Sequence, residues 1–403
     1  MQKEPRITQR AQSIAPFYVM EVGREAEALA RSAVCDPARG GRRMVFLNIG
    51  EPEWPAAAGV VDAAKATLDA GRTQYTPATG LPALREAIAG WYGSHFGLDI
   101  ATSRIVVTAG ASAALQLASL ALFETGDRVL MPDPSYPCNR HFVTATGATP
   151  VLLPTNAAQR FQPSCTQIAA AWDEHTRGVV LASPSNPTGT SIAPHELRAI
   201  HALARERGGV TIVDEIYLGL SFERQYGHSA LALGDDVVSV NSFSKYFGMT
   251  GWRLGWLVLP EALVAPVERL AQNLYICPSA VAQHAALACF EPEALAEYER
   301  RRALLQARRD FVVTELTAMG LPVPVAPDGA FYAWIDVSSV TTSSWDYAFE
   351  LMRNAQIALT PGRDFGHAEP ERWMRLSFAG PIEDLREALA RWRAVLPAKK
   401  VAA

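Results

Sequence analysis

The feature that most constrains the fold of this chain is a repeated alternation of short apolar segments with helical patterns between residues 104 and 258. The apolar segments are rich in Val, Ile and Leu and are too short for helices, so they predict strands. The expected strands cover residues 104–108, 128–132, 149–153, 178–182, 210–213, 237–240 and 254–258. Helical patterns before and between them cover residues 55–70, 81–96, 112–123, 139–146 and 194–207. This alternation predicts an α/β fold, in which helices cover both faces of a mostly parallel sheet.

The pattern changes beyond residue 290. A long charged helix over 295–319 precedes a strand at 331–335, a helix, a short strand near 357, a strand at 373–377 and a last helix at 382–396. This order is typical of a smaller α+β domain. The length of 403 residues suits more than one domain. We expect a large domain over 51–290 and a small domain made of 1–50 and 291–403.

Composition excludes several classes of protein. The net charge is −4, which argues against a nucleic-acid-binding protein. Hydrophobic residues make up 49% and charged residues 19%, a balance that favours a globular protein with surface buried in an oligomer. The five cysteines are widely spaced and form no C-x-x-C pair, so we expect free thiols in a reducing compartment and no metal site.

Targeting signals are not expected either. The charged N-terminal residues lack the apolar core of a signal peptide. The uncharged stretch 105–123 contains Gly-Ala-Ser in its first half, so a strand, a turn and a buried helix explain it better than a membrane span. We therefore expect a cytoplasmic protein with no membrane or nucleic-acid partner.

Polar residues follow the ends of four predicted strands, where ligands bind in parallel sheets. The first group is T-A-G-A-S, in which Gly110 permits a tight turn and the N–H groups of Ala111 and Ser112 can hold a phosphate at a helix start. Simple helix capping is the alternative. The second is Asn186 in SPSNPTG, for which an ordinary Asn-Pro turn is the alternative.

The third group, VDEIY, places Asp214 at the end of a very apolar strand, with Tyr217 three residues later. A buried carboxylate needs a cation or strong donor, although Asp214 could also cap the next segment. In the fourth, NSFSKYFGMTGWRLGW, Lys245 lies among aromatic residues. Desolvation would lower its pKa and make it a nucleophile toward carbonyls, whereas most lysines are simply solvated. Arg253 lies between glycines and can bind an anion.

One ligand has the groups that all four features need: pyridoxal 5′-phosphate (PLP), with a phosphate, an aldehyde, a ring nitrogen and a ring hydroxyl. In these motifs and their order, the chain resembles the fold-type I, PLP-dependent class I/II aminotransferases, close to the bacterial aspartate/aromatic/alanine aminotransferase-like subgroup. The resemblance runs from NIGEP at 48–52 to RLSFA at 375–379. S-x-S-K followed by G-x-R-x-G is its most specific part, and NPTG and D-E-x-Y reinforce it.

The resemblance implies a role for each matching residue. Lys245 would form the internal aldimine with PLP and move protons during a ping-pong reaction through pyridoxamine phosphate. Asp214 would pair with the pyridine nitrogen, and Asn186 and Tyr217 would bond the ring hydroxyl. The remaining roles are phosphate binding by Gly110, Ala111, Ser112, Ser242 and Arg253, and ring stacking by Tyr136.

It also implies a shared active site in a homodimer, because Tyr75 in QYTPATG matches a tyrosine that reaches the neighbouring subunit's phosphate. Arg375 would bind the substrate α-carboxylate in a bidentate pair, and the Gly50 backbone would add a donor. The segment 14–22 would lie over the substrate and move on closure.

Substrate and reaction remain open at this stage. No second arginine is evident near Ser279, so a neutral or aromatic side chain is the expected substrate class. The expected activity is transfer of an amino group from an L-amino acid to a 2-oxo acid. A carbon–sulfur β-lyase or a related eliminase is the alternative, because such enzymes share the PLP-binding motifs. A PLP-sensing regulator would need an additional N-terminal DNA-binding domain, and NIGEP begins at residue 48, too early for one.

Overall fold

The largest element of the computed structural model, which describes residues 5–396, is a seven-stranded sheet in the order β2-β8-β7-β6-β5-β3-β4. Its strands are β2 (Ile105–Thr108), β3 (Arg128–Asp133), β4 (Thr149–Pro154), β5 (Thr176–Ala182), β6 (Val210–Asp214), β7 (Val238–Ser242) and β8 (Gly255–Val258). The five strands from β7 to β4 run parallel, and β8 is antiparallel to both β7 and β2. The predicted α/β class with a mostly parallel sheet is confirmed.

The antiparallel direction of β8 determines which strand ends lie at the same edge of the sheet. Because β2 and β7 both run opposite to β8, the carboxyl end of β2 lies at the same edge of the sheet as the carboxyl ends of β3, β5, β6 and β7. The residues that precede β8 reach that edge as well. Loops far apart in the sequence therefore converge on one edge.

Alternating side chains place two sets of helices on the sheet. On one face, Val106, Val180 and Ile212 pack in one cluster with α5 (Ala111–Leu122), α6 (Pro137–Thr146) and α9 (Glu261–Leu274). On the other face, Val179 and Val213 pack with α7 (Cys165–Ala171) and α8 (Pro194–Glu206). Successive residues such as Val179 and Val180 point to opposite faces, as in any strand buried on both sides.

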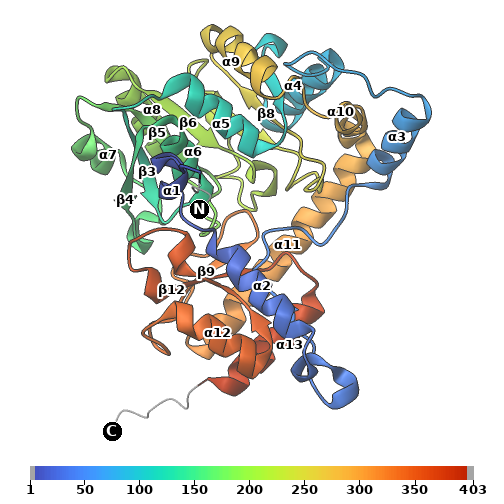
Figure 1. The fold of residues 1–403 in the computed structure, drawn as a ribbon, viewed down its shortest axis with the longest axis vertical. Coiled ribbons are helices and arrows are strands. Elements are labelled where there is room, and N and C mark those ends of the chain that lie inside the picture. Colours follow the sequence, from blue (N-terminus) through green and yellow to red (C-terminus); the bar gives the residue numbers. More distant parts are fainter. Residues whose placement is uncertain (1–4, 397–403) are drawn as a thin grey trace.

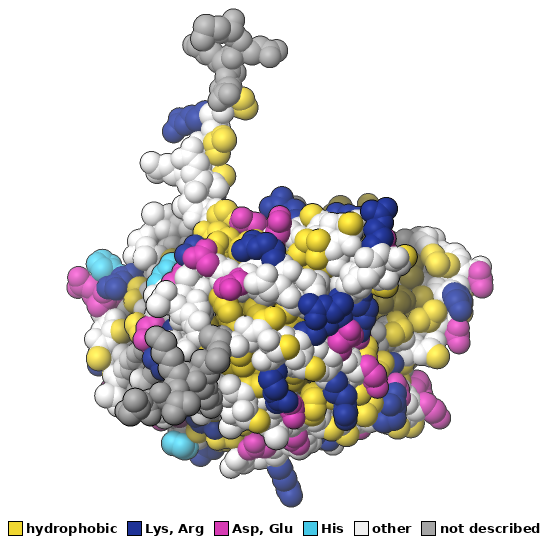
Figure 2. All heavy atoms as spheres, turned by 90° about the horizontal axis from the view of Figure 1, so that it is seen from below, with side chains coloured by type: hydrophobic (Ala, Val, Ile, Leu, Met, Phe, Trp, Pro, Cys, Tyr) yellow, Lys and Arg dark blue, Asp and Glu magenta, His cyan; other side chains and the backbone are white. Residues whose placement is uncertain are grey.

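A second layer of structure lies at the other end of the molecule. A three-stranded sheet has the order β11 (Thr360–Pro361), β12 (Trp373–Ser377), β9 (Tyr332–Asp336), and a parallel pair joins β1 (Val45–Phe46) to β10 (Ile357–Ala358). In Figure 1 this part lies below the large sheet, with α2 (Tyr18–Ala30), α12 (Ser344–Ala355) and α13 (Ile382–Val395) around it. Seen from below, its surface carries side chains of both charges interspersed with apolar ones (Figure 2).

The remaining helices are α1 (Gln9–Ser13), α3 (Ala58–Asp69), α4 (Pro82–Phe96), α10 (Ala280–Ala286) and the long α11 (Pro292–Met319), which runs from the upper part of Figure 1 toward the lower part. β1, which lies within the first fifty residues, pairs in parallel with β10 of the C-terminal part. The division into two domains at residues 50 and 290 itself stays a prediction. The short helix α7 was not predicted, because a helix of seven residues is too short to show a period.

Candidate active site

A cavity of about 460 Å³ opens at the edge of the large sheet where the strand ends converge. Its volume lies in the usual range for small-molecule sites, about 300–1,000 Å³. Eleven of the thirteen predicted site residues line it: Gly50, Ala111, Ser112, Tyr136, Asn186, Asp214, Tyr217, Ser242, Lys245, Arg253 and Arg375. Residues separated by more than 300 positions in the sequence thus share one cavity wall.

One end of the cavity is a cradle for an anion. Gly110 has φ of 87° at the N-cap of α5, and no side chain caps this helix, so its first N–H groups are free for a ligand. A Cβ added to Gly110 would lie 2.5 Å from Nη2 of Arg253, which places the guanidinium directly at the turn. Ser242 is the last residue of β7, and its hydroxyl donates to Ser244 Oγ at 2.9 Å. The cradle offers N–H groups and a cation to one phosphate.

The carboxylate of Asp214 is buried at the end of β6. Its Oδ1 accepts one hydrogen bond, from the Ile216 N–H at 3.1 Å. Burial raises the pKa of Asp214 to about 7, although the nearby Lys245 acts in the opposite direction. A carboxylate so placed is stabilised by a cationic or N–H group entering the cavity.

The amine of Lys245 lies between this carboxylate and two arginines. Burial lowers the pKa of Lys245 to about 8, with Arg375 and Arg253 adding to the effect and Glu51 opposing it. Its Nζ donates a hydrogen bond of 2.6 Å to the carbonyl of Gly50. The neutral amine is therefore accessible near physiological pH, which nucleophilic and general-base chemistry both need. Gly50 faces Lys245 with its carbonyl, an acceptor.

Arg375 extends from β12 into the opposite wall. Its Nη1 donates to Oδ1 of Asn186 at 2.8 Å, and its Nη2 donates to the Asn48 carbonyl at 2.7 Å. The guanidinium lies 4.4 Å from the centre of the Tyr332 ring, and its Nε is buried without a partner. Within residues 5–396, no carboxylate forms an ion pair with it. A buried guanidinium in this state is suited to the carboxylate of a ligand.

Two aromatic side chains complete the walls. Tyr136 lies at the start of α6 and contacts the Phe17 ring edge-on, with ring centres 6.4 Å apart. Burial raises the pKa of the Tyr217 hydroxyl well above its ordinary value, so this group stays protonated. The Tyr217 hydroxyl lies 2.9 Å from that of Tyr332.

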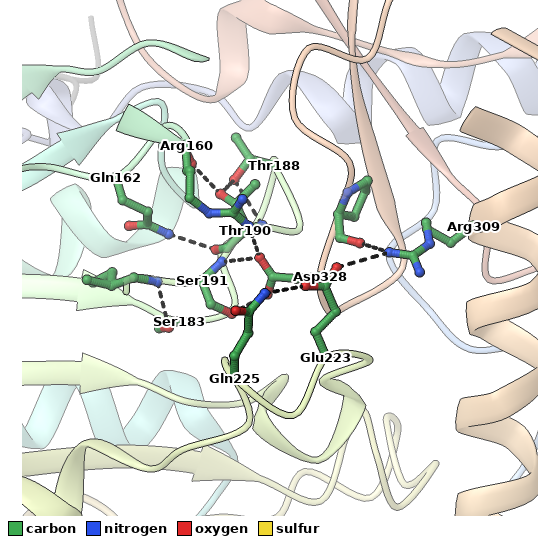
Figure 3. Close-up of polar contacts among 12 residues, drawn as sticks. Arg160, Gln162, Ser183, Thr188, Thr190, Ser191, Glu223, Gln225, Arg309 and Asp328 are labelled. Atoms are coloured by element: carbon green, nitrogen blue, oxygen red, sulfur yellow. Dashed lines mark hydrogen bonds and ion pairs between the residues drawn. The ribbon is translucent and has the colours of Figure 1, made fainter. Parts of the chain in front are cut away.

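The loop that carries Asn186 is fixed from behind by a buried polar network (Figure 3). Asp328 accepts hydrogen bonds from the Ser191 N–H at 2.9 Å and from the Ser191 hydroxyl, and it forms an ion pair with Arg160. The Asp328 N–H donates to the Gly189 carbonyl at 2.9 Å. The network joins the 183–191 loop of the large sheet to the segment that enters β9 at Tyr332.

Two predicted residues lie outside the cavity lining. Gly110 lies at the turn before α5, where the absence of a side chain leaves room for the Arg253 guanidinium. Tyr75 is 80% exposed and is not among the residues that line the cavity, so this chain alone does not bring it to the site. Sequence reasoning also missed Tyr332, because an aromatic residue in the buried strand FYAWI reads as core. The G-A-F-Y turn before that strand was the available signal.

Comparison with known proteins defines the class. A family model described as aminotransferase class I and II matches residues 42–391. The chain belongs to this family, so the predicted family and the predicted aminotransferase activity are confirmed. Class I/II aminotransferases use PLP and act on amino acids and 2-oxo acids.

Individual relatives differ in substrate. The chain is 40% identical over 395 residues to the valine–pyruvate aminotransferase of Mycobacterium tuberculosis, covering 98% of this chain and 99% of the relative. A crystal structure of an aminotransferase from M. tuberculosis matches with a TM-score of 0.92 and 40% identity, covering 98% of this chain and 100% of that one. The aspartate aminotransferase of Thermus thermophilus with maleate matches with a TM-score of 0.89 and 31% identity, covering 98% and 100%. Family membership thus fixes the reaction class and leaves the substrate open.

The cavity fits PLP on its own features. The free helix start and Arg253 suit the phosphate, the buried Asp214 suits the pyridine nitrogen, and the amine of Lys245 suits the aldehyde. Between residues 5 and 396, no cluster of His, Cys, Asp or Glu is arranged to hold a metal ion. In the same range, none of the helices is both long and apolar enough to cross a membrane.

Proposed function

We propose that this aminotransferase takes its amino group from a neutral or aromatic L-amino acid and passes it to a 2-oxo acid. One observation carries this proposal: the cavity wall formed by the N-terminal segment presents the apolar side chains of Phe17, Val19 and Met20. A carboxylate on the substrate side chain would lose hydration against these three apolar side chains. Arg24 and Glu27, which carry opposite charges, also line this wall.

The other cavity residues would have separate roles in substrate binding and proton transfer, which follow from their positions. Arg375 would bind the α-carboxylate, displacing nothing charged, and Asn186 would hold Arg375 in place through their mutual hydrogen bond. Lys245, with its lowered pKa, would move a proton between the substrate Cα and C4′ of the cofactor. When bound, PLP supplies an electron-withdrawing ring that stabilises negative charge at Cα, and Asp214 would hold a proton on that ring.

The remaining cofactor contacts follow from position. Gly110, Ala111, Ser112, Ser242 and Arg253 would bind the phosphate. Tyr136 would stack on the ring, while Asn186 and Tyr217 would bond its hydroxyl.

The experiment is a titration of the purified holoenzyme with a panel of L-amino acids, followed in the visible spectrum. Alanine, valine, leucine, methionine and phenylalanine should each convert the bound cofactor to its amino form, and a 2-oxo acid should reverse the change. Faster conversion by aspartate than by all of these would refute the substrate class. The panel also includes cysteine, whose thiol can leave from Cβ; release of pyruvate, ammonia and sulfide from it without conversion of the cofactor would favour the β-lyase reaction.

We also propose that the enzyme works as a homodimer with shared sites. The support is the exposure of Tyr75, together with exposed apolar side chains at Ile49 and Ile276. In this arrangement Tyr75 would reach the phosphate cradle of the neighbouring subunit.

Subunit mixing tests the shared site. Lys245→Ala and Tyr75→Ala variants should each have low activity, whereas coexpressed subunits of the two should regain one intact site per mixed dimer. If coexpression restores nothing although mixed dimers form, Tyr75 does not act across subunits.

A further inference from the structure

Helix α2 forms the wall of the active-site cavity that faces the substrate side chain. The residues of this segment that line the cavity are Phe17, Val19, Met20, Gly23, Arg24 and Glu27. They recur every three or four positions, so a single face of the helix is turned to the cavity. A small rotation or shift of α2 would therefore change the shape offered to the substrate side chain without touching the α-carboxylate site.

The helix does not fix its own N-terminus. Its N-cap residue is Phe17, which has no side chain that can cap the free N–H groups. The cap comes from Asp364 instead: its Oδ1 accepts from the Tyr18 N–H at 2.8 Å, and its Oδ2 accepts from the Val19 N–H. Both oxygens are used, and the positive end of the helix favours the charged carboxylate.

Asp364 is itself held firmly. It is buried in the 3₁₀ turn Gly362–Asp364, directly after β11, and its carbonyl accepts from Arg140 Nη2 at 2.9 Å. The next residue, Phe365, packs its ring 4.9 Å from the guanidinium of Arg375. The carboxylate that anchors α2 is thus attached to the same rigid strand pair that carries the α-carboxylate site.

We propose that Asp364 is a positioning residue for substrate selection: it sets the distance between the α2 wall and Arg375, and so the side-chain size that the cavity accepts. This inference rests on the proposed function, because it assumes that Arg375 binds the α-carboxylate and that α2 faces the side chain. Asp364 does not touch the substrate in this arrangement and acts through the backbone of α2.

The test compares Asp364→Asn with the wild type on a series of increasing side-chain size: alanine, valine, leucine and phenylalanine. The amide keeps one acceptor and loses the other together with the charge, so the wall should loosen. We expect KM to rise by about tenfold for leucine and phenylalanine, equivalent to ~1.4 kcal/mol, and much less for alanine, with kcat and the cofactor spectrum nearly unchanged. Asp336→Asn is the matched control, a buried carboxylate that pairs with Arg372 at the end of β9.

A second pair of variants keeps the test valid if Asp364→Asn folds poorly. Tyr18 is the first residue of α2, a position that accepts proline, so Tyr18→Pro removes the N–H that Asp364 binds and preserves the helix. Tyr18→Ala removes the same ring and keeps the N–H. The proline variant should reproduce the size-dependent rise in KM, and the alanine variant should not.

Three outcomes would overturn the proposal. They are an equal rise in KM across the series, no rise, and the same pattern in Asp336→Asn. Activity of the wild type on aspartate, measured beside this series, separates failure of this proposal from failure of the proposed function. If the wild type prefers aspartate, the proposed substrate class is wrong. The comparison of variant with wild type can then be made on aspartate against the longer glutamate.

Discussion

The ion pair between the buried Asp328 and the partly exposed Arg160 gives the sharpest prediction of stability. Asp328 has 0% of its side chain exposed and accepts from Ser191 as well as from Arg160, whose side chain is 31% exposed. Breaking a fully buried ion pair destabilises a protein by about 3–5 kcal/mol. Because Arg160 can turn toward solvent and an amide would keep one bond to Ser191, we expect Asp328→Asn to lower the free energy of unfolding by about 2–3 kcal/mol.

The assay is urea unfolding of the holoenzyme at fixed, saturating PLP. Asp62→Asn is the control, because Asp62 forms an ion pair with Lys65 at 3.1 Å while 72% exposed, and such pairs contribute about 0–1 kcal/mol. In a double-mutant cycle, Arg160→Gln should lower the free energy of unfolding by less in the Asp328→Asn background than in the wild type.

The same variant has a kinetic signature. Asp328 holds the loop of Asn186, which bonds Arg375, so KM should rise by a similar factor for every amino acid. An Asp328→Asn protein within 0.5 kcal/mol of the wild type, roughly the scatter of neutral surface changes, would refute this account of the network.

Three further predictions concern the cavity and its surroundings. Arg375→Lys should raise KM at least about tenfold for all amino acids alike, since lysine cannot make a bidentate pair; an effect on one substrate only would assign Arg375 to the side chain. Gly110→Ala should weaken PLP binding about tenfold in a spectroscopic titration, because φ of 87° disfavours alanine and the added Cβ would displace Arg253. An unchanged affinity for PLP would show that this turn does not bind the phosphate. Burial raises the pKa of Glu215 to about 7, so its neutral form stabilises the fold at low pH. As pH rises from 4.5 through 7, the free energy of unfolding of the wild type should fall by up to about 3 kcal/mol relative to that of Glu215→Gln. Parallel curves of stability against pH for the two proteins would contradict this.

Much of the fold could be predicted because its signals are local. The apolar runs that became β5 and β6 are rich in Val with Leu or Ile, in strands of seven and five residues, and Gly110 and Asn186 follow strands as turn residues do. Lys245 and Asp214 stood out because polar groups at the ends of apolar strands are expensive to bury without a purpose.

What could not be predicted depends on direction and distance. The sequence of β8 looks like any other buried strand, yet it runs antiparallel, and only this reversal brings Arg253 to the cradle before the strand begins. Tyr332 and Asp364 carry no local signal. Tyr332 resembles an aromatic core residue, and Asp364 resembles an ordinary acidic residue of a loop. Their roles depend on contacts with residues that are distant in the sequence.

The cap on α2 also sets an order of events during synthesis. Tyr18 and Asp364 are 346 residues apart, so at about 5–20 residues per second the ribosome makes the helix some 17–70 s before it makes the carboxylate that anchors it. Through that interval the large sheet, the cradle and Lys245 can assemble while the apolar wall residues of α2 have no fixed place. A nascent chain would therefore be able to hold its cofactor before it can discriminate among substrates.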